Sequence, residues 1–371
     1  MRCNRCAMDD SIPTIKFDEN GVCSFCNQHN TWERENPTDG VRLNKLMKTI
    51  REEGEGKRYD CIATVSGGAD SSYLLYLAKE VWKLRPLAFH FDNGWNTQIA
   101  KNNIQNLVDK LNVDYYSYSV DRAEFDDFCA SFLKASVPDA DIPNDIGMTT
   151  AFYEIAQRFG IKNVLIGHSF RTEGSIPLGW TYMDGKYIES VTQKYGTHMI
   201  KSFPNLWLRK WLYWITISGI KVLRPFWYMN YNPTEAREFL TKNYGFEWYK
   251  TKHAENKYTK FIAYYYLYNK FGIDKRFVRL SAPVRSGYLS RDEVIKALSK
   301  PPIVEEEIIS EVKTRLYLTD EKFNDIMVAP KHTYRDYKTY HETFKRHKIL
   351  FSLLSKLNLV PITFYKKYVE A

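Results

Sequence analysis

The sequence has no apolar run long enough to cross a membrane as a helix. Its most apolar stretch, Trp211 to Ile220, is ten residues long and lies between Lys210 and Lys221, whereas a membrane-spanning helix needs about 20 residues. No secretory signal precedes the first cysteines. We therefore expect a cytoplasmic protein with no transmembrane segment. Residues 206–223 remain a candidate for contact with a membrane surface or a partner.

Internal repeats and low-complexity linkers are also missing from the 371 residues. The apolar fraction of 44% excludes general disorder and is enough for a sizeable core. Lys and Arg number 53 against 44 Asp and Glu, which gives a net charge of +9. This charge suits an anionic partner, but nucleotide phosphates, an acidic sugar, nucleic acid and a membrane surface would all satisfy it.

Cysteine is scarce, with six residues, and four of them are grouped near the start of the chain. They form two Cys-x-x-Cys pairs separated by sixteen residues: Cys3, Cys6, Cys23 and Cys26. This is zinc-ribbon spacing, and four thiolates close a tetrahedral site with no open position for chemistry. We therefore predict a structural Zn²⁺. An iron–sulfur cluster on the same thiolates is an alternative, as are disulfides.

A short β-branched strand, Tyr59–Val65, leads into a loop that lacks the Gly-Lys-Ser/Thr ending of a Walker A motif. The loop and the helix start that follows it contain Ser66, Gly67, Gly68, Asp70, Ser71 and Ser72. Glycines there let backbone N–H groups face an anion at the positive end of the helix, and the serines add hydroxyl donors. We predict a pyrophosphate-binding loop for an ATP that is cut between its α and β phosphates.

Strands alternate with helices after residue 58, which predicts an α/β fold with a doubly wound parallel sheet. The expected strands are 59–65, 86–91, 114–120 and 163–166, and the expected helices are 70–83, 97–111, 122–134 and 149–159. We divide the chain into a zinc-ribbon module at 1–40, an ATP-binding domain at 41–186 and a mostly helical substrate or partner region at 187–371. Val41–Glu53 should be the connecting helix.

The ends of the second and fourth strands supply further candidate residues, because parallel strands end at the same edge of the sheet. We place His90, Phe91 and Asp92 with ATP, and Asn93 at the substrate or pyrophosphate. After the fourth strand, Gly167 permits close approach to ATP, Arg171 is suited to a phosphate or carboxylate, and Glu173 to magnesium or ammonia. A solvated loop would also account for the charges on Arg171 and Glu173.

A basic cluster precedes an aromatic helix that begins near Phe261. Lys252, His253 and Lys260 are the candidates for neutralising a departing pyrophosphate. Positive charge at a helix start is unfavourable, which a bound anion would compensate. A solvated run of charges is the alternative.

The loop from Ser66 to Ser71 resembles that of the PP-loop ATP pyrophosphatases, the adenine nucleotide α-hydrolase-like family of asparagine synthetase, GMP synthetase, NAD synthetase and several tRNA-modifying enzymes. The resemblance implies that ATP, with Mg²⁺, activates an oxygen as an adenylate. In such a site we assign catalytic roles to Asp70, Lys252 and Glu173.

The four cysteines, this loop, Phe91-Asp-Asn-Gly-Trp-Asn96, the segment 252–261 and Phe271-Gly-Ile-Asp-Lys-Arg276 together resemble the N-acetyl sugar amidotransferases. The resemblance covers about residues 1 to 300 and implies the making of acetamidino sugars for lipopolysaccharide O-antigen or pseudaminic-acid-type glycans. ATP would adenylate the N-acetyl oxygen of a nucleotide-activated sugar, and ammonia would displace AMP. No glutaminase nucleophile is recognisable in the sequence. The resemblance implies a partner glutaminase of the histidine-biosynthesis type with a barrel subunit.

Two other functions remain open at this point. A tRNA-modifying enzyme of the thiolation type also combines Cys-x-x-Cys pairs with a PP-loop, but sulfur transfer needs further reactive cysteines, and only Cys61 and Cys129 remain. A nucleic-acid-binding zinc protein on a degenerate ATP fold is opposed by the intact loop. We therefore do not favour a nucleic-acid partner.

Overall fold

The computed structural model describes residues 1–177, 179–249, 254–357, 359–360 and 368–369. Among these residues, one parallel sheet has five strands in the order β3-β2-β1-β4-β5. The strands are β1 (Cys61–Thr64), β2 (Pro86–Asp92), β3 (Tyr115–Ser119), β4 (Asn163–Leu165) and β5 (Lys221–Leu223). The first four were predicted from the sequence and are confirmed. The order reverses between β1 and β4, as expected for a doubly wound sheet.

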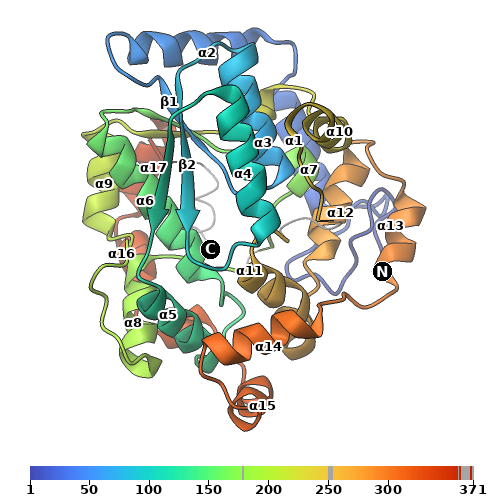
Figure 1. Ribbon diagram of the computed structural model, residues 1–371. Helices are drawn as coiled ribbons and strands as arrows, with labels where there is room; N and C mark the ends of the chain where they lie inside the picture. Colours follow the sequence, from blue (N-terminus) through green and yellow to red (C-terminus); the bar gives the residue numbers. More distant parts are fainter. Residues whose placement is uncertain (178, 250–253, 358, 361–367, 370–371) are drawn as a thin grey trace.

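Helices cover both faces of the sheet because successive side chains of a strand point to opposite sides. Ile62, Leu87 and Phe89 pack into one core, and Cys61 and Ala63 pack on the other side. The first face is covered by α5 (Arg122–Lys134), α6 (Ile142–Arg158), α8 (Gly185–Tyr195) and α9 (Leu208–Thr216). The second is covered by α2 (Val41–Gly54), α3 (Ala69–Tyr76), α4 (Gln98–Leu111) and α10 (Pro233–Tyr244). Figure 1 shows α3 and α4 on one side of the strands and α6 on the other.

The region after residue 186 is mostly helical but also completes the sheet, because β5 lies within it. Its remaining helices are α11 (Lys257–Phe261), α12 (Arg276–Arg285), α13 (Arg291–Leu298), α14 (Glu306–Arg315), α15 (Asp320–Val328), α16 (His341–Arg346) and α17 (Lys348–Lys356). π-Helical turns occupy Leu77–Val81 and Ile262–Phe271, and 3₁₀-helical turns occupy Pro225–Tyr228 and Tyr334–Asp336. The sheet thus includes a strand from beyond the boundary predicted at residue 186, since β5 belongs to the second region but pairs with β4 of the first.

Helix α9 carries much of the apolar run noted in the sequence. Trp214 and Ile215 on this helix are buried, whereas Tyr213 and Ile217 are exposed. The run is therefore explained largely by packing against the core. None of the helices in the described parts of the chain is both long and apolar enough to span a membrane.

The first forty residues form a small module around α1 (Ser24–Glu35) that packs against the C-terminal helices. Its cysteines share an apolar cluster with Trp180 and Val278, the latter on α12. Arg291 fastens the module, because its guanidinium donates to the carbonyl oxygen of Cys3 at 2.8 Å and to that of Cys6 at 3.2 Å. Residues far apart in the sequence thus meet at this module.

Candidate active site

A cavity of about 520 Å³ opens at the carboxyl ends of β1, β2, β4 and β5. Ligands of doubly wound sheets bind at this edge. The strand ends and the loops after them contribute Thr64, Val65, Ser66, Phe89, His90, Phe91, Ile166, Gly167, His168, Val222 and Arg224. Six of the residues predicted from the sequence therefore line one cavity, namely Ser66, Ser71, His90, Phe91, Gly167 and Glu173.

The loop between β1 and α3 is held by its own serines. The backbone N–H of Ser66 donates to Ser71 Oγ at 3.1 Å, and that of Gly68 donates to Ser66 Oγ at 3.3 Å. Gly67 has φ of +82°, and a Cβ there would lie 2.5 Å from the carbonyl oxygen of Ala100. Glycine is thus required both by conformation and by space. Gly68 directly precedes α3, so the loop lies at the positive end of that helix.

Gly167 brings the end of β4 against the same helix start. A Cβ on Gly167 would lie 3.0 Å from backbone atoms of both Asp70 and Ser71. The sequence predicts that Gly167 permits close approach of ATP; in the structure, the group that closely approaches this glycine is the start of α3.

Asp70 lies in the first turn of α3, next to the cavity but outside its lining. The hydroxyl of Tyr231 donates to Asp70 Oδ1. Tyr231 is fixed by stacking on Phe226, with ring centroids 4.0 Å apart and planes 7° apart. Burial, and then the charge of Asp70, raise the pKa of the Tyr231 hydroxyl well above its usual value. Tyr231 therefore stays a hydrogen-bond donor that orients the carboxylate.

Glu255 is a site residue to which the sequence gave no role. Its Oε1 accepts a hydrogen bond from Ser66 Oγ at 3.3 Å, and the residue lines the cavity. Its pKa is raised, chiefly by burial and also by the charge of Asp70. The backbone of the 254–256 segment is tied to the β2 side of the site, since the Thr97 N–H donates to the Glu255 carbonyl at 2.9 Å. The charged run before the aromatic helix was the signal that could have pointed to it.

His90 is a neutral lining residue rather than a base. Its Nδ1 lies 2.9 Å from the carbonyl oxygen of Val65, and its Nε2 lies 3.0 Å from Nδ2 of Asn96. These partners fit an Nδ1–H donor and an Nε2 acceptor. Burial lowers the pKa of His90, which keeps the ring uncharged at neutral pH.

Three other predicted residues do not line the cavity. Asp92 Oδ1 accepts from the Gly94 N–H at 2.9 Å, which shapes the turn after β2. Asn93 donates to Asn144 Oδ1 at 2.8 Å and thereby holds a residue that does line the cavity. Ser72 is buried, and its hydroxyl has no hydrogen-bond partner in the described part of the chain. Asp92 thus stabilises the turn after β2, and Asn93 links that turn to Asn144 on α6.

Helix α6 forms a wall that the sequence predictions missed. It begins at Ile142 rather than at Thr149, and the missed turns carry acidic residues. Positions spaced three or four apart, as one helix face requires, line the cavity: Asp141, Asn144, Asp145, Met148, Thr149 and Phe152. Burial, and then the neighbouring charge of Asp145, raise the pKa of Asp141 to about 7. Pro143 in the first turn was the available signal for the helix start.

The sequence places Arg171 at a phosphate or substrate carboxylate, but its guanidinium is committed to other residues and does not line the cavity. It donates to both carboxylate oxygens of Glu33 at 2.8 and 2.7 Å, and to the carbonyl oxygens of Trp227 and Asn36. Only 3% of Arg171 is exposed. The residue therefore links the N-terminal module to the β4 loop.

Replacing Arg171 with alanine should destabilise the protein by about 2–3 kcal/mol, because Glu33 and two carbonyl groups lose their donor. Arg58→Ala is the matched control, since the side chain of Arg58 is 73% exposed in its pair with Asp114 and should cost less than about 1 kcal/mol. Denaturant unfolding of both variants tests this. Equal losses would contradict the linking role.

Lys260 is also placed away from the predicted role. Its ammonium group contacts both carboxylate oxygens of Glu305 at 2.7 and 2.6 Å, and the residue does not line the cavity. The positive charge at the start of α11 is thus offset by an acidic residue rather than by pyrophosphate. Lys252 and His253 lie outside the described residues. Glu173 does line the cavity, 4.0 Å from His168.

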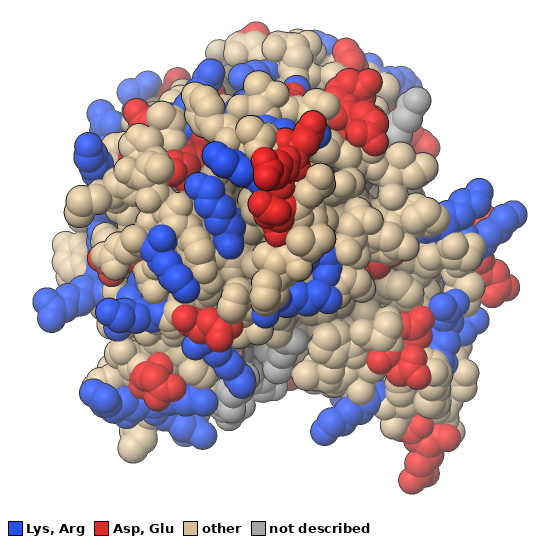
Figure 2. Space-filling view, turned by 90° about the horizontal axis from the view of Figure 1, so that it is seen from below, with Lys and Arg blue, Asp and Glu red and all other residues tan. Residues whose placement is uncertain are grey.

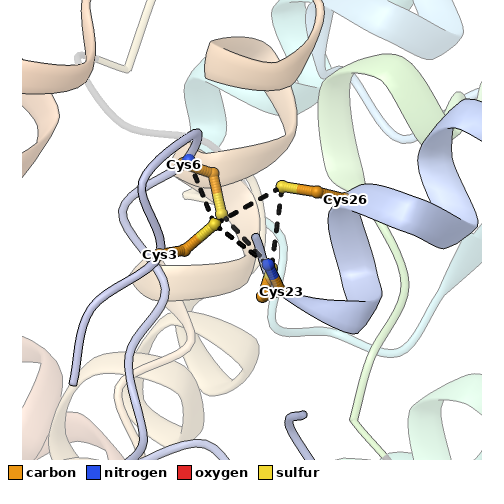
Figure 3. Close-up of side chains that lie close together, drawn as sticks. All are labelled: Cys3, Cys6, Cys23 and Cys26. Atoms are coloured by element: carbon orange, nitrogen blue, oxygen red, sulfur yellow. Dashed lines mark hydrogen bonds between the residues drawn. The ribbon is translucent and has the colours of Figure 1, made fainter. Parts of the chain in front are cut away.

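The four N-terminal cysteines converge on one point (Figure 3). Neighbouring sulfurs are 3.8 Å apart for Cys3 and Cys26, 3.7 Å for Cys6 and Cys23, and 3.6 Å for Cys23 and Cys26. A disulfide would require about 2.05 Å. Sulfurs about 2.3 Å from a tetrahedral zinc are about 3.8 Å from one another. The set fits a single metal ion, whereas a four-iron cluster, with each cysteine on a different iron, needs wider spacing.

The chain thus has a doubly wound parallel sheet, with the Ser-Gly-Gly-x-Asp-Ser loop before α3 and the cavity beside it, which is the fold class predicted from the sequence. Its residues 255–350 match the family described as LPS biosynthesis protein WbpG-like, C-terminal domain. The match begins at Glu255, which contacts the PP-loop. An uncharacterized protein of Methanocaldococcus jannaschii is 25% identical over 279 residues, which is 73% of this chain and 85% of that protein.

Solved structures give more distant likenesses. NMN synthetase from Francisella tularensis has 13% identity and a TM-score of 0.34, covering 76% of this chain and 94% of its own. NH3-dependent NAD synthetase from Campylobacter jejuni has 12% identity and a TM-score of 0.32, covering 78% and 96%. U34-tRNA thiolase NcsA from Methanococcus maripaludis has 11% identity and a TM-score of 0.31, covering 89% of each chain. These likenesses are too distant for the activities of those proteins to be transferred.

Proposed function

We propose that this chain is an ATP-dependent, AMP-forming amidotransferase that converts the N-acetyl group of a nucleotide-activated bacterial sugar into an acetamidino group. The observation that carries the proposal is the contact between Glu255 and the loop that begins at Ser66. There the segment that matches the WbpG-like family of LPS biosynthesis contacts the PP-loop through Ser66 and lines the same cavity. An ATP-binding loop and a family of surface-glycan synthesis thus meet at one site.

The reaction requires two steps, the first at the α-phosphorus of ATP and the second at the carbonyl carbon of the N-acetyl group. The amide oxygen of the N-acetyl group attacks the α-phosphorus of ATP, and the bond from that phosphorus to pyrophosphate breaks. Ammonia then adds to the activated carbon, a proton leaves the nitrogen, and the carbon–oxygen bond to AMP breaks to give the amidine. Adenylation is needed because an amide oxygen is otherwise a poor leaving group.

The chain's residues suit these steps. The N–H groups of the loop at the start of α3 would hold the phosphates. Asp141, whose pKa is raised to about 7, and Asp145 line the cavity and would take up the proton released from nitrogen. The apolar wall, which includes Met148 and Phe152, would limit access of water to the activated carbon.

Two metal ions fit the residues present. Asp70 and Glu255 are close enough for the charge of one to raise the pKa of the other, and Glu173 lies on the same cavity. Carboxylates of this kind suit Mg²⁺, which would neutralise the phosphate charge. The four cysteines suit a Zn²⁺ that stabilises the N-terminal module without taking part in the chemistry.

Ammonia would come from a partner glutaminase and its barrel subunit. In support, the two cysteines outside the cluster, Cys61 and Cys129, are buried, and burial raises the pKa of both thiols. Neither suits a nucleophile for glutamine hydrolysis or sulfur transfer.

ATP and free thiols both suit the cytoplasm. On the face seen in Figure 2, Lys and Arg are interspersed with Asp and Glu, unlike the basic stripe of many tRNA-binding proteins.

Mass spectrometry of reactions with ATP, magnesium, ammonium and a panel of nucleotide-activated N-acetyl sugars tests the proposal. AMP should form in step with the loss of oxygen and gain of nitrogen in one sugar, with a mass change of about −1 Da. A matched reaction without the sugar is the control. AMP formation that requires tRNA, and none with any sugar, would replace this function with RNA modification.

A further inference from the structure

The end of β5 places an arginine on the active-site cavity. Arg224 follows the last residue of β5 and lines the cavity together with Val222. Its backbone is fixed on both sides. The Ile166 N–H donates to the Leu223 carbonyl at 3.0 Å, and the Trp227 N–H donates to the Arg224 carbonyl at 3.0 Å. The guanidinium therefore projects from a rigid part of the sheet edge.

Within the described residues, no carboxylate forms an ion pair or hydrogen bond with Arg224. Burial lowers its pKa, and the groups that act in the opposite direction are the phenols of Tyr153 and Tyr228. Four carboxylates also line the cavity: Asp141, Asp145, Glu173 and Glu255. None of these four forms an ion pair or hydrogen bond with Arg224 in the described part of the chain.

A half-buried guanidinium such as that of Arg224, without a counter-charge, is costly to the protein. Two other arginines show the usual arrangement, in which a carboxylate offsets the charge. Arg171 is paired with Glu33, and Arg315 is paired with Asp126 at 2.9 Å. Among the described residues that line the cavity, Arg224 is the one Lys or Arg. An anion that enters the cavity is the missing partner for this charge.

The side chains beside Arg224 suit a ring-bearing ligand. Tyr153 and Trp211 line the cavity and lie together, and Tyr153 stacks on Trp214 with planes 3° apart. Met183 also lines this part and is shared with a second, smaller cavity of about 110 Å³. Flat, rigid aromatic groups next to a cation are typical of sites for sugars and nucleotides that carry negative charge.

We propose that Arg224 binds an oxyanion of the acceptor, either the diphosphate of its nucleotide carrier or a carboxylate on its sugar. ATP then occupies the end of the cavity near α3, and the acceptor occupies the end at β5. The acceptor class rests on the proposed function, whereas the anion site at Arg224 rests on the geometry alone.

Binding of UDP, UDP-N-acetylglucosamine and its C6 uronate, measured by calorimetry for the full chain, tests the proposal without requiring turnover. Arg224→Ala should weaken binding by about 30-fold, because a charge-assisted pair is lost. Arg224→Lys should recover part of the affinity, since it keeps the charge but not the two-pronged geometry. Arg209→Ala, at an exposed arginine of α9, is the control. The melting temperature of Arg224→Ala should change little, because no ion pair is lost and the guanidinium lies a long 6.0 Å from the centre of the Trp227 ring.

The three probes separate the two sources of the oxyanion. A loss with all three assigns the diphosphate, and a loss with the uronate alone assigns the carboxylate. Unchanged binding by Arg224→Ala, no binding of any probe to the wild type, or weakened binding of ATP instead would overturn the proposal. A failure of the amidine assay with Arg224-dependent probe binding intact would overturn only the proposed reaction.

Discussion

Replacing Asp70 with asparagine is expected to reduce AMP formation at least about a thousand-fold while leaving the fold and the metal content unchanged. The carboxylate lies in the first turn of α3, directly after the PP-loop, and Tyr231 orients it. Its negative charge helps to raise the pKa of Glu255, which lines the cavity. Loss of this charge would remove a magnesium ligand from the place where the negative charge of pyrophosphate develops. Quantifying AMP and pyrophosphate in single-turnover reactions measures the effect.

Asparagine is a sharper test than alanine at this position. Tyr231 is buried, with 1% of its surface exposed, and alanine would leave its hydroxyl without an acceptor, at a cost of about 1–3 kcal/mol in stability. Asparagine keeps an oxygen for that hydrogen bond. Tyr231→Phe is the complementary variant, because it keeps the charge of Asp70 but not its orientation, and it should lose activity only partly. A folded Asp70→Asn protein that forms AMP at the wild-type rate would contradict the PP-loop assignment.

Local sequence patterns predicted most of the sheet correctly. Strands β1 to β4 and the helices α4 and α5 lie within a few residues of their predicted limits, as does α3 together with the wider helical turn Leu77–Val81 that continues it, because each has an apolar period that matches its structure. The loop at Ser66 was equally predictable, since its glycines satisfy local requirements: Gly67 needs a positive φ, and its neighbours permit no Cβ. Four cysteines at ribbon spacing converge for the same local reason.

Features that depend on distant parts of the chain could not be predicted in this way. Strand β5 has only three residues and follows an apolar helix, so its place in the sheet, and with it the position of Arg224, depends on pairing with β4. Arg171 looked like an anion ligand because Glu33, its partner, is 138 residues away. Lys260 and Glu305 are a similar case, separated by 45 residues. Charged residues near a site acquire their roles from such partners.

Replacing Cys23 with serine should abolish stoichiometric metal binding and unfold the N-terminal module. All four sulfurs are buried with 0% exposure, and Cys23 contributes to two of the short sulfur–sulfur contacts. A structural zinc supplies about 10–16 kcal/mol of apparent binding energy in small zinc-finger peptides, which is more than the total stability of most domains. The small apolar cluster around the cysteines is poorly placed to compensate for that loss. Metal analysis by mass spectrometry, with limited proteolysis of residues 1–40, measures both effects.

Cys61→Ser is the matched control, because it makes the same chemical change at a fully buried cysteine in β1, outside the cluster. This variant should lose stability but retain one metal ion per chain. Loss of the module in Cys23→Ser should also release Arg171 and Arg291 from their contacts with it, which exposes the β4 loop beside the active site. We therefore expect AMP formation to fall as well, although no cysteine reaches the cavity. Full metal retention by Cys23→Ser would contradict the four-thiolate site. Detection of iron and acid-labile sulfide in the wild-type protein would show that the cysteines hold an iron–sulfur cluster and not zinc.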